Sequence, residues 1–128
     1  MRKRNAWWLV VAAYAALVFV LSVAPISPGV SIPHLDKVAH LCEYLVFAYL
    51  LVQAIRATWH GERAYLLWAW IYATSYGLLM ELIQIMVPWR SAELGDALAN
   101  AVGAALGVWI GQYLPKSSSC KVHGPPSV

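Results

Sequence analysis

The sequence predicts an all-α integral membrane protein with four transmembrane helices in an antiparallel up-and-down bundle. Of its 128 residues, 61% are hydrophobic and only 12% are charged, whereas soluble domains carry about 25% charged residues. The mean hydropathy is +0.61. Four apolar segments each approach the roughly 20 residues that a helix needs to cross the hydrocarbon core. We therefore expect one transmembrane domain over residues 1–115, followed by a disordered, Ser- and Pro-rich cytoplasmic tail over residues 116–128.

The first apolar segment, Trp7 to Ala24, contains no charged residue and is expected to be a transmembrane helix. A signal peptide is the alternative, because the basic stretch MRKRN precedes the segment and Ser22-Val23-Ala24 resembles a small-residue cleavage site. However, the apolar run exceeds the roughly 7 to 15 residues of a signal core, and Pro25 would directly follow the cleaved bond. These two features favour the transmembrane helix.

Three further apolar segments follow, and the stretches between them are rich in Pro, Gly and charged residues, which are typical of turns and loops. The three segments run over Val38–Ile55, Ala64–Val87 and Leu94–Leu114. Because all the connections are short, neighbouring helices are expected to run antiparallel.

The basic residues predict the orientation in the membrane. Seven of the nine Lys and Arg residues precede the first segment, lie between the second and third, or follow the fourth; Lys37 and Arg90 are the exceptions. Basic loops are retained in the cytoplasm, so both termini are expected to be cytoplasmic. The net charge of +3 thus reflects membrane anchoring, and we expect no nucleic-acid partner.

Polar and charged residues gather near one end of each of the last three segments. They are Asp36, Lys37, His40, Glu43 and Tyr44 in or just before the second, Glu81 and Gln84 in the third, and Asp96 and Asn100 in the fourth. Asp36, His40 and Tyr44 are four residues apart and therefore share one helix face. Because successive helices alternate in direction, all these groups are expected near the extracytoplasmic ends, beside the Pro88–Ser91 loop. The sequence therefore predicts one outward-facing polar pocket.

Glu81 shows why a charged group in this pocket needs a partner or a proton. An ionised carboxylate at a helix centre costs about 2.5 to 3.5 kcal/mol on insertion scales. We therefore expect Glu81 either to pair with Arg90, Lys37 or His40, or to take up a proton. The alternative is that these polar groups only fix the packing of three helices, as polar residues in membrane bundles can.

The fourth segment carries Ala99, Gly103, Gly107 and Gly111 at intervals of four residues. Such a ridge of small residues lets a neighbouring helix approach closely. We expect it to pack helices together, and a homo- or hetero-oligomer through Gly103, Gly107 and Gly111 is a further expectation.

Two stretches together resemble the VanZ-like family of small bacterial membrane proteins. They are DKVAHLCEYLVFAYL and ELIQIMVPWRSAELGDALANAVGAALG, and the motif-bearing part covers residues 36–107. Trp89 stands where a small residue such as glycine is expected. The matching positions are Asp36, Lys37, His40, Tyr44, Glu81, Gln84, Pro88, Arg90, Ser91, Asp96, Asn100, Gly103 and Gly107.

The resemblance implies a multi-pass protein of the bacterial cytoplasmic membrane and assigns no reaction. The family takes its name from a protein linked to low-level resistance to the glycopeptide teicoplanin. Membership does not by itself make this chain a resistance factor.

For the pocket we hypothesise an envelope enzyme or binding protein for an anionic, lipid-linked substrate that bears phosphate. Arg90 would bind the phosphate through its planar fork and Lys37 as a point charge. The expected catalytic residues are His40, because histidine titrates near neutral pH, together with Glu81 and Asp96. Membrane lipids are the expected partners. The other residues expected to contact substrate are Asp36, Tyr44, Gln84, Ser91 and Asn100.

A metal-dependent variant of this hypothesis would use His40, Glu43, Glu81 and Asp96 as mixed nitrogen and oxygen ligands. No tight ligand spacing such as His-Glu-x-x-His occurs in the sequence, and the nearby basic residues would repel a cation. We therefore expect no metal and no other cofactor.

Three further alternatives use the same residues. The chain could be a non-enzymatic scaffold or partner subunit whose polar cluster only fixes helix packing. Proton or ion transport through the buried acids is disfavoured, because the cytoplasmic halves of the helices carry no comparable polar relay. Ser91 could act as a nucleophile, but a turn-capping role before the fourth helix is favoured.

Overall fold

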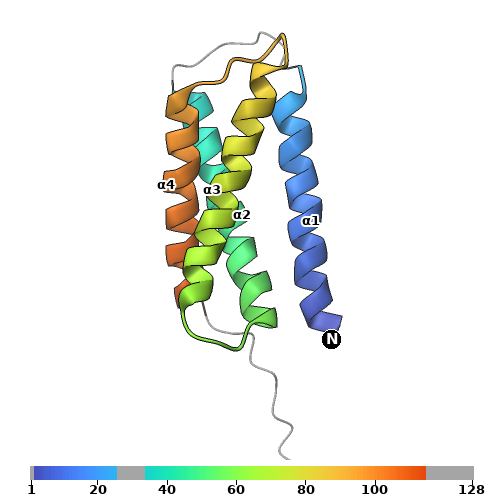
Figure 1. Ribbon diagram of the computed structural model, residues 1–128, viewed down its shortest axis with the longest axis vertical. Coiled ribbons are helices and arrows are strands. Elements are labelled where there is room, and N and C mark those ends of the chain that lie inside the picture. The colour runs from blue at the N-terminus through green and yellow to red at the C-terminus, as the bar shows by residue number, and fades with distance from the viewer. Residues whose placement is uncertain (1, 26–33, 115–128) are drawn as a thin grey trace, which may run out of the picture.

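Four antiparallel helices make up the computed structural model of the chain, which describes residues 2–25 and 34–114 (Figure 1). The helices are α1 (Arg2–Val23), α2 (Leu35–Thr58), α3 (Ala64–Ile85) and α4 (Leu94–Tyr113). All four are long and apolar enough to cross a membrane. The predicted fold class is confirmed, and the chain is a multi-pass membrane protein. The tail over residues 116–128, predicted to be disordered, lies outside the described residues.

The helix ends follow from local sequence. Helix α2 begins at Leu35 rather than at the predicted Val38, which places Asp36 in its first turn. A carboxylate there interacts favourably with the positive end of the helix dipole. Helix α3 ends at Ile85, shortly before Pro88, because a residue that precedes proline is disfavoured in helical conformation.

The small-residue ridge of α4 packs against α2 of the same chain. Gly103 and Gly107 are buried, and a Cβ atom on either would overlap a backbone carbonyl oxygen of α2, that of Leu41 or Leu45 respectively. Further along, a Cβ atom on Gly111 would lie 3.0 Å from Val52 Cγ1. The predicted role of the ridge in helix packing is confirmed. The ridge therefore offers a second chain no surface while α2 and α4 stay together, and the oligomeric state stays a prediction.

Helix α1 packs on α2 and α3 and, within the described ranges, not on α4. Figure 1 shows α1 and α4 on opposite sides of the bundle. Side chains from elsewhere in the chain bond to carbonyl groups of α1: the Tyr76 hydroxyl donates to Ala15 (2.6 Å), Gln84 Nε2 to Ser22 (3.2 Å) and Trp89 Nε1 to Val23 (2.9 Å). In return, the Tyr14 hydroxyl donates to the Glu43 carbonyl of α2 (2.9 Å). Hydrogen bonds to neighbouring helices thus add to the apolar packing of Val11 and Val18 in holding the first helix in the bundle.

The outer faces of the helices are apolar. Large side chains such as Leu9, Val20, Leu78, Leu98 and Val102 are exposed. In a soluble protein such a surface would favour aggregation, but in a bilayer it faces lipid tails of the same polarity. The polar groups instead concentrate inside the bundle, at the end where α2 begins and α3 ends.

Candidate functional site

Helices α2 and α4 begin, and helix α3 ends, at the same end of the bundle (Figure 1). The buried polar side chains of these three helices lie towards that end. The helix directions alone bring these three ends together, as the topology predicted. Each of the six buried polar members is less than one-tenth exposed: Tyr44, His40, Glu81, Gln84, Asp96 and Asn100. This set is called the polar cluster below.

His40 is the centre of a group of carboxylates. Its Nε2 atom lies 3.8 Å from Asp36 Oδ1 and 3.9 Å from Asp96 Oδ2, while Nδ1 lies 4.0 Å from Glu43 Oε2. The side chain of Asp96 is only 3% exposed, whereas that of Asp36 is 63% exposed. His40 therefore connects a buried carboxylate on α4 with two carboxylates on its own helix.

Lys37 lies beside two carboxylates at the edge of the polar cluster, those of Glu93 and Asp96. Its Nζ atom donates to Glu93 Oε2 at 3.0 Å and lies 3.8 Å from Asp96 Oδ1. Lys37 was expected to hold substrate phosphate. The structure shows it engaged by carboxylates of the chain itself, which leaves its role as a phosphate ligand a prediction.

Glu81 has no salt bridge in residues 2–25 and 34–114, and neither of its buried carboxylate oxygens has a protein hydrogen-bond partner there. The expected pairing with a cation is therefore not formed. Glu81 is nevertheless close enough to His40, Asp96 and Arg90 to interact with each electrostatically. It extends the carboxylate group around His40 onto α3.

The amide and phenol members of the cluster pack where α2, α3 and α4 meet. A Cβ atom on Gly77 of α3 would lie 3.0 Å from both Tyr44 Cε1 and Asn100 Nδ2. The Tyr44 hydroxyl and both polar atoms of the Asn100 side chain have no protein hydrogen-bond partner in the described part of the chain. Gln84 differs, because its Nε2 atom donates to α1.

A cavity of about 350 Å³ opens beside the cluster, between α1 and the start of α2. One part of its wall is apolar and comes from α1, through residues that include Leu17 and Leu21. The other part is polar: Asp36, His40, Glu43 and Arg90. The cavity thus combines an aliphatic wall with titratable groups and a guanidinium, which is the polarity pattern of a lipid with a charged head group.

Arg90 and Ser91 belong to the loop between α3 and α4. Arg90 lines the cavity, and its Nε atom has no hydrogen-bond partner among the described residues. Ser91 is exposed, and the N-cap of α4 is Glu93, with no side-chain cap hydrogen bond. The expectation that Ser91 caps the fourth helix is wrong, because the extended residue that precedes the first turn is Glu93.

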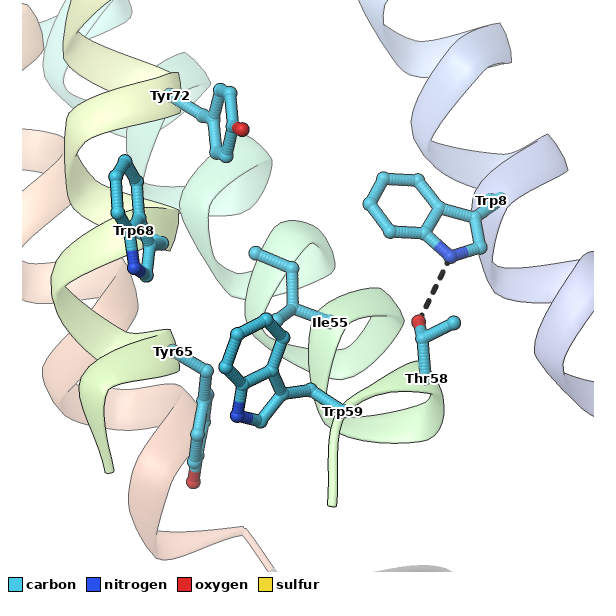
Figure 2. A pocket seen from close by; sticks show the side chains of 7 residues that line it. All are labelled: Trp8, Ile55, Thr58, Trp59, Tyr65, Trp68 and Tyr72. Atoms are coloured by element: carbon cyan, nitrogen blue, oxygen red, sulfur yellow. Dashed lines mark hydrogen bonds between the residues drawn. The ribbon is translucent and has the colours of Figure 1, made fainter. Parts of the chain in front are cut away.

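A second cavity, of about 450 Å³, lies at the opposite end of the bundle. Trp8 Nε1 donates to Thr58 Oγ1 at 3.0 Å beside it, and Figure 2 shows the aromatic rings around it. It contains no carboxylate or histidine, and its Trp and Tyr side chains are typical of a membrane-interface belt. Its lining residues are Trp8, Ile55, Thr58, Trp59, Tyr65, Trp68 and Tyr72.

Comparison with known proteins tests the resemblance seen in the motifs. A family model described as VanZ/LLP1 matches residues 3–114, which is nearly the whole four-helix region. The chain belongs to the VanZ/LLP1 family. No curated protein and no solved structure matched the chain. The match extends well beyond the motif-bearing residues 36–107 and includes α1, so the helix that supplies the apolar cavity wall is part of the VanZ/LLP1 pattern.

Sequence reasoning missed one contributor to the site of this VanZ/LLP1 member, the apolar wall from α1. Glu43 was placed in the polar pocket, although a role was considered for it only as a metal ligand. The apolar wall from α1 carries no sequence signal, because Leu17 and Leu21 look like any lipid-facing residues. The candidate catalytic and substrate-binding roles themselves stay predictions.

Proposed function

We propose that the cavity between α1 and α2 binds an anionic, lipid-linked envelope substrate through its phosphate group. The observation that carries this proposal is the composition of the cavity wall, which is aliphatic on α1 and bears Arg90, His40 and carboxylates opposite. A lipid-linked phosphate has the same two parts. Its chain would lie along Leu17 and Leu21, and its head group would lie at the polar end.

Arg90 is the residue best suited to hold the phosphate. It lines the cavity, whereas Lys37 is engaged by Glu93 and is not part of the cavity wall. A guanidinium can bind two phosphate oxygens at once with charge-assisted hydrogen bonds. The loop between α3 and α4 thus supplies the head-group contact.

His40 is the proposed proton-transfer residue. It lines the cavity, and its two ring nitrogens face different carboxylates, Nε2 towards Asp36 and Asp96 and Nδ1 towards Glu43. Carboxylates in these positions can orient an imidazole for proton transfer. Glu81 and Asp96 complete the proposed catalytic set, while Tyr44, Gln84, Ser91 and Asn100 would position groups around it.

We also propose that the polar end faces outward from the cytoplasmic membrane. Helix α1 begins and helix α4 ends at the opposite end of the bundle. The excess of Lys and Arg at that end supports a cytoplasmic location. A C-terminal tag should therefore resist protease in intact spheroplasts and be cleaved after lysis. Cleavage in intact spheroplasts would contradict this orientation.

Lipid mass spectrometry of whole cells tests the function. Cells that lack the protein and cells that express Glu81→Gln should show the same change in a phosphate-bearing envelope lipid, relative to wild type. Glu62→Gln serves as the control, because Glu62 is exposed in the loop between α2 and α3. Unchanged envelope lipids in cells that lack the protein would instead support the non-enzymatic scaffold.

The scaffold alternative is favoured by one observation, the hydrogen bonds that connect Gln84 and Trp89 to α1. These contacts show that polar groups at this end do hold helices together. If holding the helices were the whole function, the Glu81→Gln variant would lose folded protein in the membrane and would not change a lipid at normal abundance.

A further inference from the structure

Negative charge exceeds positive charge at the polar end of the bundle. Lys37 is paired with Glu93, which leaves Arg90 as the cation that lines the cavity in the described part of the chain. Around it remain four carboxylates: Asp36, Glu43, Glu81 and Asp96. A site in a membrane protein with this excess of negative charge favours the binding of a cation.

His40 and two of these carboxylates, Asp36 and Asp96, have potential ligand atoms close together. His40 Nε2 is 3.8 Å from Asp36 Oδ1 and 3.9 Å from Asp96 Oδ2, and single ligand atoms of the three residues lie within 4.8 Å of one another. An ion with bonds of about 2.1 Å can bridge atoms up to roughly 4.2 Å apart. Each contact of His40 Nε2 is shorter than this limit, whereas the three atoms together lie only within 4.8 Å, so the exposed side chain of Asp36 would have to turn inward for one ion to bind all three.

Asp96 and His40 each carry one buried polar atom without a hydrogen-bond partner in the described residues, on the side away from their mutual contact. The side chain of Asp96 is 3% exposed and that of His40 is 8% exposed, and neither Asp96 Oδ1 nor His40 Nδ1 has a hydrogen-bond partner within residues 2–25 and 34–114. Glu43 Oε2 lies 4.0 Å from that same Nδ1 atom. A carboxylate behind the distal nitrogen of a histidine is the usual outer support of a metal-bound imidazole.

We propose that Asp36, His40 and Asp96 form a binding site for one divalent transition-metal ion, such as Zn²⁺ or Mn²⁺. One histidine and two carboxylates suit these ions, and three protein ligands leave coordination positions open. Asp36 and His40 line the cavity, so the open positions face it. The set differs from the one that the sequence suggested, because Asp36 replaces Glu43 and Glu81 as a direct ligand.

Basic residues were expected to repel a metal cation from this site, and in the structure this repulsion is weaker than the sequence implied. The ammonium group of Lys37 lies 3.0 Å from Glu93 and 3.8 Å from Asp96, so its charge is offset locally. An ion here would also give a phosphate head group a second positive partner beside Arg90. A bound ion would occupy Nε2 of His40 and would replace the proton-transfer role proposed for that residue. The role of the ion towards phosphate rests on the proposed function, whereas the site itself rests on the ligand geometry alone.

Metal titration of the purified chain tests the site. After the protein has been stripped with EDTA, calorimetry with Zn²⁺ and separately with Mn²⁺ should show one ion bound per wild-type chain. His40→Gln and Asp96→Asn should each weaken binding at least tenfold, and Glu43→Gln by about 10- to 100-fold. Glu62→Gln is the matched control and should bind like wild type, because Glu62 is exposed in the loop between α2 and α3.

Cobalt spectroscopy keeps the test decisive if a variant does not fold. Wild type loaded with Co²⁺ should show visible absorption from nitrogen and oxygen ligands, and Glu43→Gln, which retains all three ligands, should shift this band. Wild type that binds no stoichiometric ion, or metal retained unchanged by both ligand variants, would overturn the site. If the chain binds metal but no lipid phosphate, the proposed function is refuted and the metal site is retained. If it binds lipid phosphate but no metal, the metal site is refuted and the proposed function is retained.

Discussion

Gly107→Val should prevent the bundle from forming its native packing. A Cβ atom at this position overlaps the carbonyl oxygen of Leu45, which belongs to the backbone of α2 and cannot rotate away. Helices α2 and α4 would have to separate, and with them Asp96 would move away from His40. Overpacking a tight interface costs about 3 kcal/mol or more when backbone must shift.

Thermal unfolding in detergent, followed by circular dichroism, measures this effect. The matched control is Ala105→Val, which adds the same side chain to the exposed face of the same helix. The control should unfold at the wild-type temperature, whereas Gly107→Val should unfold far below it or fail to accumulate in the membrane. Equal unfolding temperatures for the two variants would show that α2 and α4 are not packed as described.

Arg90→Gln should weaken the binding of a lipid-linked phosphate by about 10- to 100-fold. A hydrogen bond to a charged group contributes about 1.5 to 3 kcal/mol, and each 1.4 kcal/mol corresponds to a factor of about ten in affinity. Arg90 lines the cavity, so its substitution removes the guanidinium there. Titration of the detergent-solubilised protein with a polyprenyl phosphate, followed by native mass spectrometry, measures the change.

The control for this prediction is Arg63→Gln. Arg63 is exposed and lies in the loop between α2 and α3, far from the cavity between α1 and α2. Both variants lose one positive charge from the chain, so a general electrostatic effect would weaken binding equally. Equal losses, or unchanged binding in Arg90→Gln, would remove Arg90 as the phosphate ligand.

Most of the fold was predictable because the bilayer restricts the solutions. A span of about 20 apolar residues has to be a helix, since lipid offers its backbone no hydrogen-bond partner. The turn formers around Pro88 and Gly61 then mark the loops. Helix ends were less predictable: Asp36 and Lys37 were placed before the second helix, although charged residues at the membrane surface can occupy a first turn.

The position of the site at one end of the bundle was predictable from the sequence, but the contacts between its side chains were not. Helix direction alone brings His40, Glu81 and Asp96 to the same end of the bundle. Which atoms meet depends on the rotation of each helix about its axis, and the close approach at Gly103 and Gly107 sets that rotation for α4. The pairing of Lys37 with Glu93 and the apolar wall from α1 both follow from this packing and leave no periodic signal in the sequence.

The proposed recognition of a lipid-linked phosphate by the cavity can be measured by comparing how purified wild-type protein binds a polyprenyl phosphate and the uncharged polyprenol of the same chain length. Both ligands offer the same aliphatic chain to α1, and only the first offers a charged head group to Arg90. We expect the phosphate to bind at least tenfold more tightly. Equal affinity for the two lipids, or binding of neither, would show that the cavity does not recognise a lipid-linked phosphate.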